Sequence, residues 1–379
     1  MRVLQVTHYV PPHHGGIERV AELLFDGYRA AGFDVEWLAS RVPRDAPAYE
    51  SGKRRVPAIN VLETTFGVPV PIWGPRAVRQ LVASVRSADV VHVHDCLYPG
   101  SAFAVRLARR YGRPSLLTQH VGFVKYKSPT LNAVQRLAYS TTGRTVLRSS
   151  TRVVLATPAA EAHVRRLLGE LPANASTIPN GMDLTRFTVA DFMARQEARR
   201  SLGLADNASV VLFAGRLVEK KGIVLVLEVA ERLTDVHFVI VGDGPLASLM
   251  PRDRRNITWT RDVPPAEMTR YYHAADCLLL PSHGEGLPLV VQEALASGLT
   301  AVVSEDEVYA PALAEAGLVR AVPRNADALA DAVPGACRER DEASAANARR
   351  YAERYWDGKV MTARYADMLR SLTSSGRQP

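Results

Sequence analysis

The fold of this chain is decided by the stretch Pro281-Ser282-His283-Gly284-Glu285-Gly286-Leu287-Pro288-Leu289-Val290-Val291-Gln292-Glu293-Ala294-Leu295-Ala296-Ser297-Gly298. It follows the apolar run Cys277 to Leu280, which is typical of a buried parallel strand. Its glycines predict a turn, and Pro288 suits the first turn of a helix. The stretch therefore predicts a strand, a glycine-rich turn and a helix whose N-terminus faces a ligand.

Two carboxylates flank the start of this predicted helix. Glu285 lies in the turn and Glu293 inside the helix, with seven residues between them. The helix N-terminus offers backbone N–H groups and partial positive charge, which suit a diphosphate, while carboxylates accept hydrogen bonds from sugar hydroxyls. The pattern favours a nucleotide sugar. The alternative is that both are solvated surface residues, as most glutamates are.

Over all its positions the stretch resembles the signature of the GT4-type retaining glycosyltransferases, or group 1 glycosyltransferases. The resemblance implies the GT-B fold, an α/β architecture of two doubly wound Rossmann-like domains that face a central cleft. It implies that a C-terminal helix crosses back to the N-terminal domain. It also implies that Glu285, Gly286, Leu287 and Glu293 contact the donor.

A second motif ends another predicted strand, in Phe213-Ala214-Gly215-Arg216-Leu217-Val218-Glu219-Lys220-Lys221-Gly222. Arginine offers a planar fork of donors and lysine a compact cation, which together suit the phosphates of a leaving diphosphate. Because this motif precedes the Glu285 segment, we expect Arg216 and Lys221 to bind the donor and, with Glu285, to take part in catalysis. The alternative is that both cations are ordinary surface residues.

The first strand leads into a third glycine-rich turn, which contains His13, His14, Gly15, Gly16 and Glu18. Adjacent glycines permit positive φ and close approach of a phosphate or sugar. The similar Gly-Gly loop of GT4 enzymes faces the donor, so the resemblance assigns Gly15 and Gly16 to donor binding. The two histidines are metal ligands by type, but we expect no metal, because adjacent histidines rarely reach one ion and no carboxylate partner is evident.

Polar residues follow two further predicted strands of the N-terminal half. His120 follows Leu116 to Gln119, on the ligand side of an open parallel sheet, where it can hydrogen-bond a sugar hydroxyl. The GT4 resemblance implies a contact with the donor sugar, and we group His120 with the catalytic residues; a structural role is the alternative. His94 and Asp95 end another strand, where we expect them to border the acceptor.

The chain departs from the GT4 pattern at two places. Arg261 stands where family members often have glycine, in a segment whose backbone contacts the nucleobase in the family. Glu305, Asp306 and Glu307 replace a glycine-rich loop that approaches the donor phosphates in the family. Three acidic residues would repel phosphate, so we expect either that this loop points elsewhere or that donor binding differs locally.

The length and the alternation of strand and helix patterns predict two domains. A chain of 379 residues exceeds one compact core of average size, and both halves alternate strand and helix signals, as in parallel sheets covered by helices. We expect an N-terminal acceptor-side domain over residues 1–182 and a nucleotide-sugar-binding domain over 207–349. The Arg-rich segment 183–206 is expected to link them, and a final helix at about 350–372 to return to the first domain.

The charge is asymmetric along the chain. Residues 1–180 contain 23 Lys plus Arg against 12 Asp plus Glu, a net charge of +11, and the remainder contains 24 against 27, a net charge of −3. No nucleic-acid-binding motif accompanies the basic half, so we expect no nucleic-acid partner. Phe123, Lys125 and Tyr126 lie in one loop, and aromatic plus basic content suits an anionic membrane surface, although an ordinary mobile loop fits equally.

The cysteines and the hydropathy bear on the cellular compartment. Cys96, Cys277 and Cys337 lack metal spacing, and their odd number argues against a disulfide framework. No run of eighteen apolar residues and no signal peptide is evident. We expect a cytoplasmic protein that can associate peripherally with the inner face of a membrane.

Together with the GT4 resemblance, these observations predict a retaining, metal-independent hexosyltransferase that uses a nucleoside-diphosphate sugar, with UDP favoured over GDP, and no cofactor. We find no Asp-x-Asp, the motif of metal-dependent glycosyltransferases of another fold. We expect the acceptor to be a hydroxyl of a sugar, a glycolipid or a small molecule, in cell-surface polysaccharide or glycolipid assembly. The alternatives are a glycosyltransferase of small natural products, a sugar-nucleotide epimerase or phosphorylase-like enzyme with the same fold, and a non-enzymatic nucleotide-sugar sensor.

Overall fold

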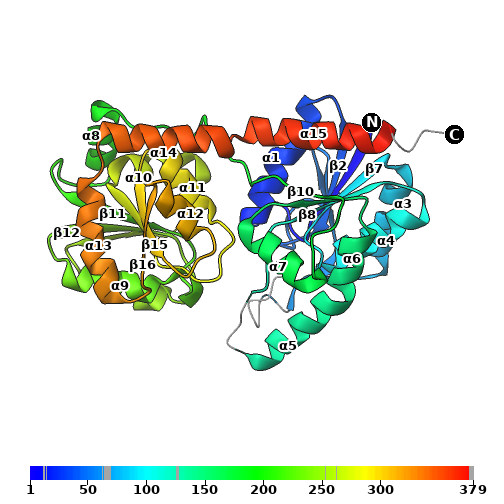
Figure 1. Ribbon diagram of the computed structural model, residues 1–379, viewed down its shortest axis with the longest axis horizontal. Helices are drawn as coiled ribbons and strands as arrows, with labels where there is room; N and C mark the ends of the chain where they lie inside the picture. Colours follow the sequence, from blue (N-terminus) through cyan, green and yellow to red (C-terminus); the bar gives the residue numbers. More distant parts are fainter. Residues whose placement is uncertain are drawn as a thin grey trace. The chain divides into compact units, whose positions relative to one another are not determined.

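The computed structural model describes residues 1–11, 13, 15–61, 63, 70–124, 128–251, 253–261 and 263–374. The chain forms two compact units, unit 1 (Met1–Gly181 with Gly358–Pro379) and unit 2 (Met182–Asp357). Each unit has a mainly parallel sheet with helices packed around it (Figure 1). The predicted α/β class with two Rossmann-like halves is confirmed.

The sheet of unit 1 has the strand order β10-β9-β8-β7-β1-β2-β4-β3. All its neighbouring strands are parallel except β3 and β4, which pair antiparallel. The strands are β1 (Arg2–Val6), β2 (Asp34–Ser40), β3 (Tyr49–Glu50), β4 (Lys53–Val56), β7 (Val90–His94), β8 (Ser115–Gln119), β9 (Arg152–Leu155) and β10 (Ala175–Thr177). A separate small hairpin pairs β5 (Ala58–Ile59) with β6 (Ile72–Trp73).

Most helices of unit 1 cover this sheet with one apolar face, whereas α5 (Pro129–Ala138) has no buried residue. In α1 the buried residues Val20, Leu24 and Tyr28 recur at helical spacing, so this face packs on the sheet. The helices are α1 (Gly16–Ala30), α3 (Pro75–Ser87), α4 (Pro99–Arg110), α5 (Pro129–Ala138), α6 (Arg144–Ser149), α7 (Pro158–Leu168) and α15 (Gly358–Ser374). The last of them, α15, packs beside α1, at the opposite end of the chain (Figure 1).

The sheet of unit 2 is parallel throughout, with the order β13-β12-β11-β14-β15-β16. The strands are β11 (Ser209–Ala214), β12 (Val236–Val241), β13 (Ile257–Thr260), β14 (Cys277–Leu280), β15 (Thr300–Ser304) and β16 (Val319–Val322). The α-helices are α8 (Phe192–Ser201), α9 (Ile223–Arg232), α10 (Met268–Ala274), α11 (Leu289–Ala296), α12 (Ala310–Glu315), α13 (Ala326–Arg338) and α14 (Glu342–Tyr355).

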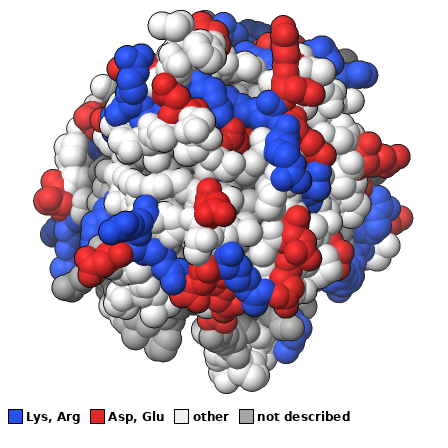
Figure 2. All heavy atoms as spheres, turned by 90° about the vertical axis from the view of Figure 1, so that its left-hand side faces the viewer, with Lys and Arg blue, Asp and Glu red and all other residues white. Residues whose placement is uncertain are grey.

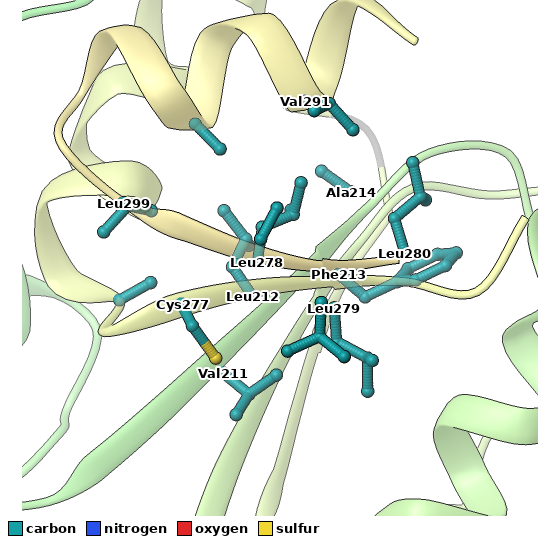
Figure 3. Close-up of a cluster of buried hydrophobic side chains, with 14 of the residues drawn as sticks. Val211, Leu212, Phe213, Ala214, Cys277, Leu278, Leu279, Leu280, Val291 and Leu299 are labelled. Carbon is teal, nitrogen blue, oxygen red and sulfur yellow. The ribbon is translucent and has the colours of Figure 1, made fainter. Parts of the chain in front are cut away.

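The core of unit 2 lies around the two central strands. β11 and β14 pair with Val211 opposite Cys277 and Leu212 opposite Leu278, and these side chains are fully buried. Figure 3 shows that Val291 of α11 and Leu299 lie over the same cluster. The helix that follows the Glu285 turn is therefore held against the sheet by apolar contacts, which places its N-terminus at the strand ends.

The segment 183–206, expected as a linker, contains α8 and belongs to unit 2. The helix packs on α10, and its Arg199 side chain donates to the Asp276 carboxylate at 2.9 Å. Arg195 pairs with the same carboxylate, which also accepts from the Val210 backbone at 2.7 Å. This buried charge network, which the sequence pattern did not reveal, holds the segment to the sheet.

The C-terminal helix expected at about 350–372 is two helices. α14 ends at Tyr355 and belongs to unit 2, whereas α15 begins at Gly358 and belongs to unit 1. Trp356 and Asp357 separate them, and the Trp356 side chain is buried in the core of unit 2. The chain therefore passes between the units twice, at Gly181–Met182 and at Asp357–Gly358.

Two surface properties bear on possible partners. Among the described residues, no helix combines the length and the apolar character that crossing a membrane requires. On the face of unit 2 that Figure 2 shows, acidic and basic side chains are interspersed. We see no extended surface of one charge on that face.

Candidate functional site

The two glycine-rich motifs of unit 2 meet where its strand order reverses. The chain proceeds from β11 outward through β12 and β13, and then returns to place β14 on the other side of β11. Ligands of open parallel sheets bind at such a reversal, beyond the carboxyl ends of the strands. Residues 215–222 follow β11 and residues 281–288 follow β14, so both motifs lie at this edge.

Glu285 is paired with both lysines of the β11 motif. Its Oε2 lies 3.3 Å from Lys221 Nζ and its Oε1 lies 3.3 Å from Lys220 Nζ. Although burial opposes ionisation, the two lysines hold the pKa of Glu285 below its usual range. The carboxylate is therefore charged at neutral pH, beside two cations that could exchange it for phosphate oxygens.

Glycines permit this close approach of the loops. Gly222 has φ +78°, and a Cβ built there would lie 2.2 Å from the Pro281 carbonyl oxygen. Gly242, after β12, has φ +134°, and a Cβ there would lie 2.0 Å from the Gly215 carbonyl oxygen. A side chain at either position would push the loops apart. Gly242 therefore also supports the site, although no sequence motif pointed to this role.

Arg216 lies at the same strand end. Its side chain is exposed and forms no hydrogen bond or ion pair with the part of the chain that the structure describes. In the β14 loop, Gly286 and Leu287 are half-buried, and Leu287 packs against the core of unit 2. The structure thus brings Arg216, Lys221, Glu285, Gly286 and Leu287 to one edge of one sheet.

Glu293 is not the exposed helix residue of the alternative interpretation. It lies in α11 and is 4% exposed. The Tyr272 hydroxyl of α10 donates a hydrogen bond to Glu293 Oε2 at 2.6 Å. A buried carboxylate needs such donors, because burial without them costs several kcal/mol. Tyr272 is thus a supporting residue that the sequence pattern did not indicate.

The acidic loop after β15 is divided between surface and interior. Glu305 and Asp306 are exposed, whereas Glu307 is 2% exposed. Glu307 Oε2 accepts from the Glu285 backbone N–H at 2.9 Å, and its Oε1 accepts from the Ser282 hydroxyl at 3.1 Å. Burial raises the pKa of Glu307 to about 7. One of the three acidic side chains therefore turns toward the Glu285 turn, and two turn away from the interior.

Arg261 is held above the ring of Trp259. Its guanidinium carbon lies 4.3 Å from the ring centroid, and Nη1 lies 3.0 Å from Asp243 Oδ2. The indole N–H of Trp259 donates to the Gly242 carbonyl at 2.9 Å. The side chain at this departure from the family pattern is thus anchored at the ends of β12 and β13.

In unit 1, the histidine of the first βα turn has the carboxylate partners that the sequence did not show. His13 Nδ1 lies 3.4 Å from Glu18 Oε1, and His13 Nε2 lies 3.2 Å from Glu63 Oε1. Against the effect of burial, these carboxylates raise the pKa of His13 to about 9. His8 Nε2 lies 3.5 Å from Glu18 Oε1, but burial lowers the pKa of His8 to about 4. His14 lies outside the described residues.

The Gly-Gly turn does not use positive φ. Gly15 caps α1 with an extended φ of −157°, and Gly16 is the first residue of the helix. A Cβ on Gly15 would lie 2.0 Å from Glu18 Oε2. The lack of a side chain at Gly15 therefore leaves room for a buried carboxylate, and neither glycine adopts the positive φ that glycine permits.

Both ring nitrogens and both backbone polar groups of His120 have hydrogen-bond partners. Its Nε2 lies 2.8 Å from His94 Nδ1 and its Nδ1 lies 3.1 Å from Asn180 Oδ1. Its backbone N–H donates to Asp95 Oδ1 at 2.9 Å, and its carbonyl accepts from Thr157. Burial lowers the pKa of His120 to about 4. Both ring nitrogens are occupied, so a sugar hydroxyl would have to replace His94 or Asn180.

The residues that we expect to border the acceptor differ in burial. His94 and Asp95 are buried, and Asp95 has φ +55°, a left-handed conformation that is uncommon outside glycine and often found at functional sites. Burial raises the pKa of Asp95 to about 7. Phe123 is half-buried, with the Arg136 guanidinium 6.0 Å from its ring centroid. Lys125 and Tyr126 lie outside the described residues.

Within the described residues, no group of three or more His, Cys, Asp or Glu side chains is arranged so that it could hold a metal ion. The three cysteines are free thiols. Cys277 and Cys337 lie with their sulfurs 3.5 Å apart in the core of unit 2.

Two family models match the chain, and together they span most of both units. The model described as "Glycosyl transferases group 1" matches residues 194–355, and "Glycosyltransferase Family 4" matches residues 14–186. The first therefore covers the strand ends that carry Arg216, Lys221, Glu285 and Glu293, and the second covers the turn at Gly15.

Named relatives and a solved structure agree with these matches. The chain is 29% identical over 250 residues to the putative teichuronic acid biosynthesis glycosyltransferase TuaC of Bacillus subtilis. The matched region covers 65% of this chain and 60% of that protein. It is 27% identical to the GDP-mannose-dependent alpha-(1-6)-phosphatidylinositol monomannoside mannosyltransferase of Mycobacterium tuberculosis, over 97% and 98% of the two chains. The Anabaena HepE structure in complex with UDP matches with a TM-score of 0.76 at 16% identity, over 98% and 100%. The fold is GT-B.

Proposed function

Since this chain belongs to the group 1 glycosyltransferases of the GT4 type, which act on nucleotide sugars, we propose that it moves a hexose from a nucleoside-diphosphate sugar to a hydroxyl acceptor with retention of configuration. One observation carries the proposal. Lys221 and Glu285, from motifs far apart in the sequence, lie 3.3 Å apart at the reversal of the strand order in unit 2. A cation and a carboxylate at this point suit the phosphate and the sugar of one donor.

The residues of unit 2 take distinct roles in this proposal. Arg216 and Lys221, with the N-terminus of α11, bind the diphosphate and stabilise the charge that develops on it as it leaves. Glu285, Gly286 and Leu287 contact the sugar. Glu293 accepts hydrogen bonds from the ribose hydroxyls, which the buried and already oriented carboxylate suits.

The residues of unit 1 are assigned to the sugar and the acceptor. Gly15 and Gly16 form the donor-side turn, and His120 contacts the donor sugar after exchanging one of its two ring partners. His94, Asp95, Phe123, Lys125 and Tyr126 border the acceptor. Exchange of the His94 contact would also free a ring nitrogen of His94 for an acceptor hydroxyl.

The donor and the metal requirement are tested together. HepE was solved with UDP, and the mannosyltransferase relative is GDP-mannose-dependent, so we propose UDP first and GDP second. Thermal unfolding is followed with UDP, GDP, ADP and dTDP and their hexose conjugates, in EDTA. A ligand at 100 times its Kd stabilises the native state by about 2.7 kcal/mol, which shifts the Tm visibly. A shift with one nucleotide series identifies the donor, whereas no shift until a divalent ion is added contradicts metal independence.

Whether the transfer retains the anomeric configuration is determined from the product. The donor that shifts the Tm is incubated with a panel of sugar, glycolipid and small-molecule acceptors, and the anomeric configuration of the product is determined by NMR. The same configuration as in the donor supports a retaining transfer, and the opposite one contradicts it. Isomerisation of the donor without transfer would indicate an epimerase instead, phosphate-dependent cleavage a phosphorylase-like enzyme, and binding without any turnover a sensor.

We also propose that unit 1 docks on an anionic membrane surface to reach a lipid-linked or polysaccharide acceptor. α5 has no buried residue, and Val134 and Leu137 on it are 58% and 64% exposed. The N-terminal half, which contains α5, carries the net positive charge. An exposed apolar helix face within a basic region suits an anionic bilayer.

Flotation with vesicles of anionic phospholipid at low salt tests this docking. Replacement of Val134 and Leu137 by serine should abolish co-flotation. Replacement of Phe192, an even more exposed apolar residue of unit 2, by serine should not. Absence of the wild-type protein from the vesicle fraction contradicts the proposal.

A further inference from the structure

Glu307 is the one carboxylate of the loop after β15 that is directed into the protein. It is 2% exposed, and both of its oxygens accept hydrogen bonds from the turn after β14, from the Ser282 hydroxyl and from the Glu285 backbone. Glu305 and Asp306, next to it, are exposed. A carboxylate is rarely so buried without a specific partner set.

The hydrogen bonds of Glu307 span the turn that the donor is expected to contact. Ser282 is the second residue of this turn and is fully buried, and Glu285 is the residue whose side chain pairs with Lys221. Gly284, between them, has φ +68°, and a Cβ there would meet no heavy atom within 4 Å. The turn is thus open to solvent at Gly284, and Glu307 bonds Ser282 and Glu285 from the buried side.

We propose that Glu307 is a positioning residue, which fixes the backbone at Glu285 and couples donor binding to a proton at its own carboxyl group. This inference rests on the proposed function, in which Glu285 contacts the sugar of the donor. The coupling follows from charge. A diphosphate bound beside the Glu285 turn brings negative charge toward a buried carboxylate, and a proton on Glu307 removes this repulsion while one oxygen still accepts the Glu285 N–H.

The groups that face Glu307 agree with this coupling. The negative charges of Glu285 and Asp306 both favour the neutral form of Glu307 by repulsion. Tyr309, which also interacts with Glu307, carries no positive charge that could oppose this. Lys220 and Lys221 are paired with Glu285 and do not bond Glu307. Burial and these neighbours raise the pKa of Glu307 to about 7, so its proton can be exchanged near neutral pH.

The test compares four variants. Glu307→Gln keeps the shape, and its amide can accept from the Glu285 N–H and donate to Ser282, as a protonated carboxyl would. Glu307→Ala removes both hydrogen bonds, and Ser282→Ala removes one. Glu305→Gln is the matched control, since it removes the same charge from the same loop at an exposed side chain.

The first measurement needs no ligand. Hydrogen exchange of the backbone amides of residues 282–286 should accelerate about tenfold or more in Glu307→Ala, less in Ser282→Ala, and little in Glu307→Gln or Glu305→Gln. If Glu307→Ala does not fold, Ser282→Ala still tests the contact. Unchanged exchange in Ser282→Ala and in any folded Glu307→Ala would overturn the positioning role.

The second measurement is the Kd of whichever of UDP, GDP, ADP and dTDP stabilises the wild type, between about pH 6 and 8.5. Relative to Glu307→Gln, the wild type and Glu305→Gln should lose affinity by about tenfold per pH unit at most as the pH rises above 7. The titration of the ligand is common to all variants. Identical pH profiles would overturn the coupling. If the wild type binds none of these nucleotides, the donor assignment and the coupling fail together, while the exchange measurement still decides the positioning role.

Discussion

Lys221 Nζ lies 3.3 Å from Oε2 of Glu285, although the two residues follow different strands of the unit 2 sheet. Their side chains are 19% and 15% exposed, so the pair is only partly screened by solvent. The cation assigned to the phosphate is therefore neutralised by the carboxylate assigned to the sugar. We infer that a donor binds by replacing this ion pair with a contact from Lys221 to the diphosphate and a contact from Glu285 to the sugar. Before the donor binds, the ion pair ensures that neither partly buried charge lacks a partner.

Replacement of Lys221 by alanine is expected to lower kcat/KM by about 10- to 150-fold, because a charged hydrogen bond contributes about 1.5–3 kcal/mol. The measurement is steady-state kinetics with the identified donor. Lys220→Ala is the control, since Lys220 makes the same contact with Glu285 but is more exposed, at 36%. An equal loss in both variants would show that Lys221 acts only through Glu285.

Replacement of Arg216 by alanine is expected to reduce kcat more than it weakens donor binding, since we propose that the guanidinium stabilises the charge that develops on the leaving diphosphate. Turnover and the Kd of the donor are measured separately. Arg324, whose side chain donates to the Pro281 carbonyl, offers a matched arginine nearby that we assign no phosphate contact. Equal losses in kcat and in affinity for Arg216→Ala would mean that Arg216 binds only the ground state.

Replacement of Glu293 by alanine is expected to weaken donor binding by about 1.5–3 kcal/mol through lost ribose hydrogen bonds. Calorimetric titration with the nucleoside diphosphate measures this loss. Tyr272→Phe removes the hydroxyl that donates to Glu293 and should cost less, because the carboxylate stays in place. Donor affinity that is unchanged in Glu293→Ala would remove this residue from the site.

Replacement of Asp276 by alanine is expected to destabilise unit 2 by about 3–5 kcal/mol, because the buried Arg199 would lose its charged partner. Chemical unfolding monitored by tryptophan fluorescence gives this change. Asp327→Ala is the control, since Asp327 pairs with Arg232 at an exposed position where an ion pair contributes about 0–1 kcal/mol. Similar losses in the two variants would contradict the role of Asp276 in holding α8.

Unit 1 is expected to lose stability as the pH falls from about 6.5 toward 4. Burial lowers the pKa of His8 and His120 to about 4 and that of His92 to about 3, so the unfolded chain takes up protons that the folded unit does not. The raised pKa of Asp95, about 7, acts oppositely, since its contribution falls as the pH rises to 7. Asp95 therefore offsets only part of the stability that the three histidines cost as the pH falls.

Hydrogen exchange of unit 1 peptides as a function of pH measures this loss, after correction for the intrinsic exchange rate. His92→Gln removes one of the titrations and should flatten the pH dependence. His92 touches no proposed ligand, and its ring bonds Tyr28 and Thr118 inside the unit. Equal stability at pH 6.5 and pH 5 in the wild type would show that these histidines accept protons without a cost to folding.

The sequence by itself determined the local structure and the kind of chemistry. The run Cys277 to Leu280 could only be a buried strand or buried helix segment, and its length and the following glycines selected the strand. The helix start near Pro288 and the α/β alternation followed from equally local rules. The resemblance of the Glu285 stretch to the GT4 signature, with the Arg216 motif before it, indicated the enzyme family.

Only the tertiary structure decided which side chains meet. The carboxylates of Glu18 and Glu63 around His13, the donation from Tyr272 to Glu293 and the inward turn of Glu307 join residues from separate elements. It also decided that 183–206 belongs to unit 2 and that the last helix breaks before Gly358. Periodicity and turn residues report the preferences of neighbouring residues along the chain. The order of strands in a sheet, which brings distant loops to one edge, depends on the packing of the whole unit.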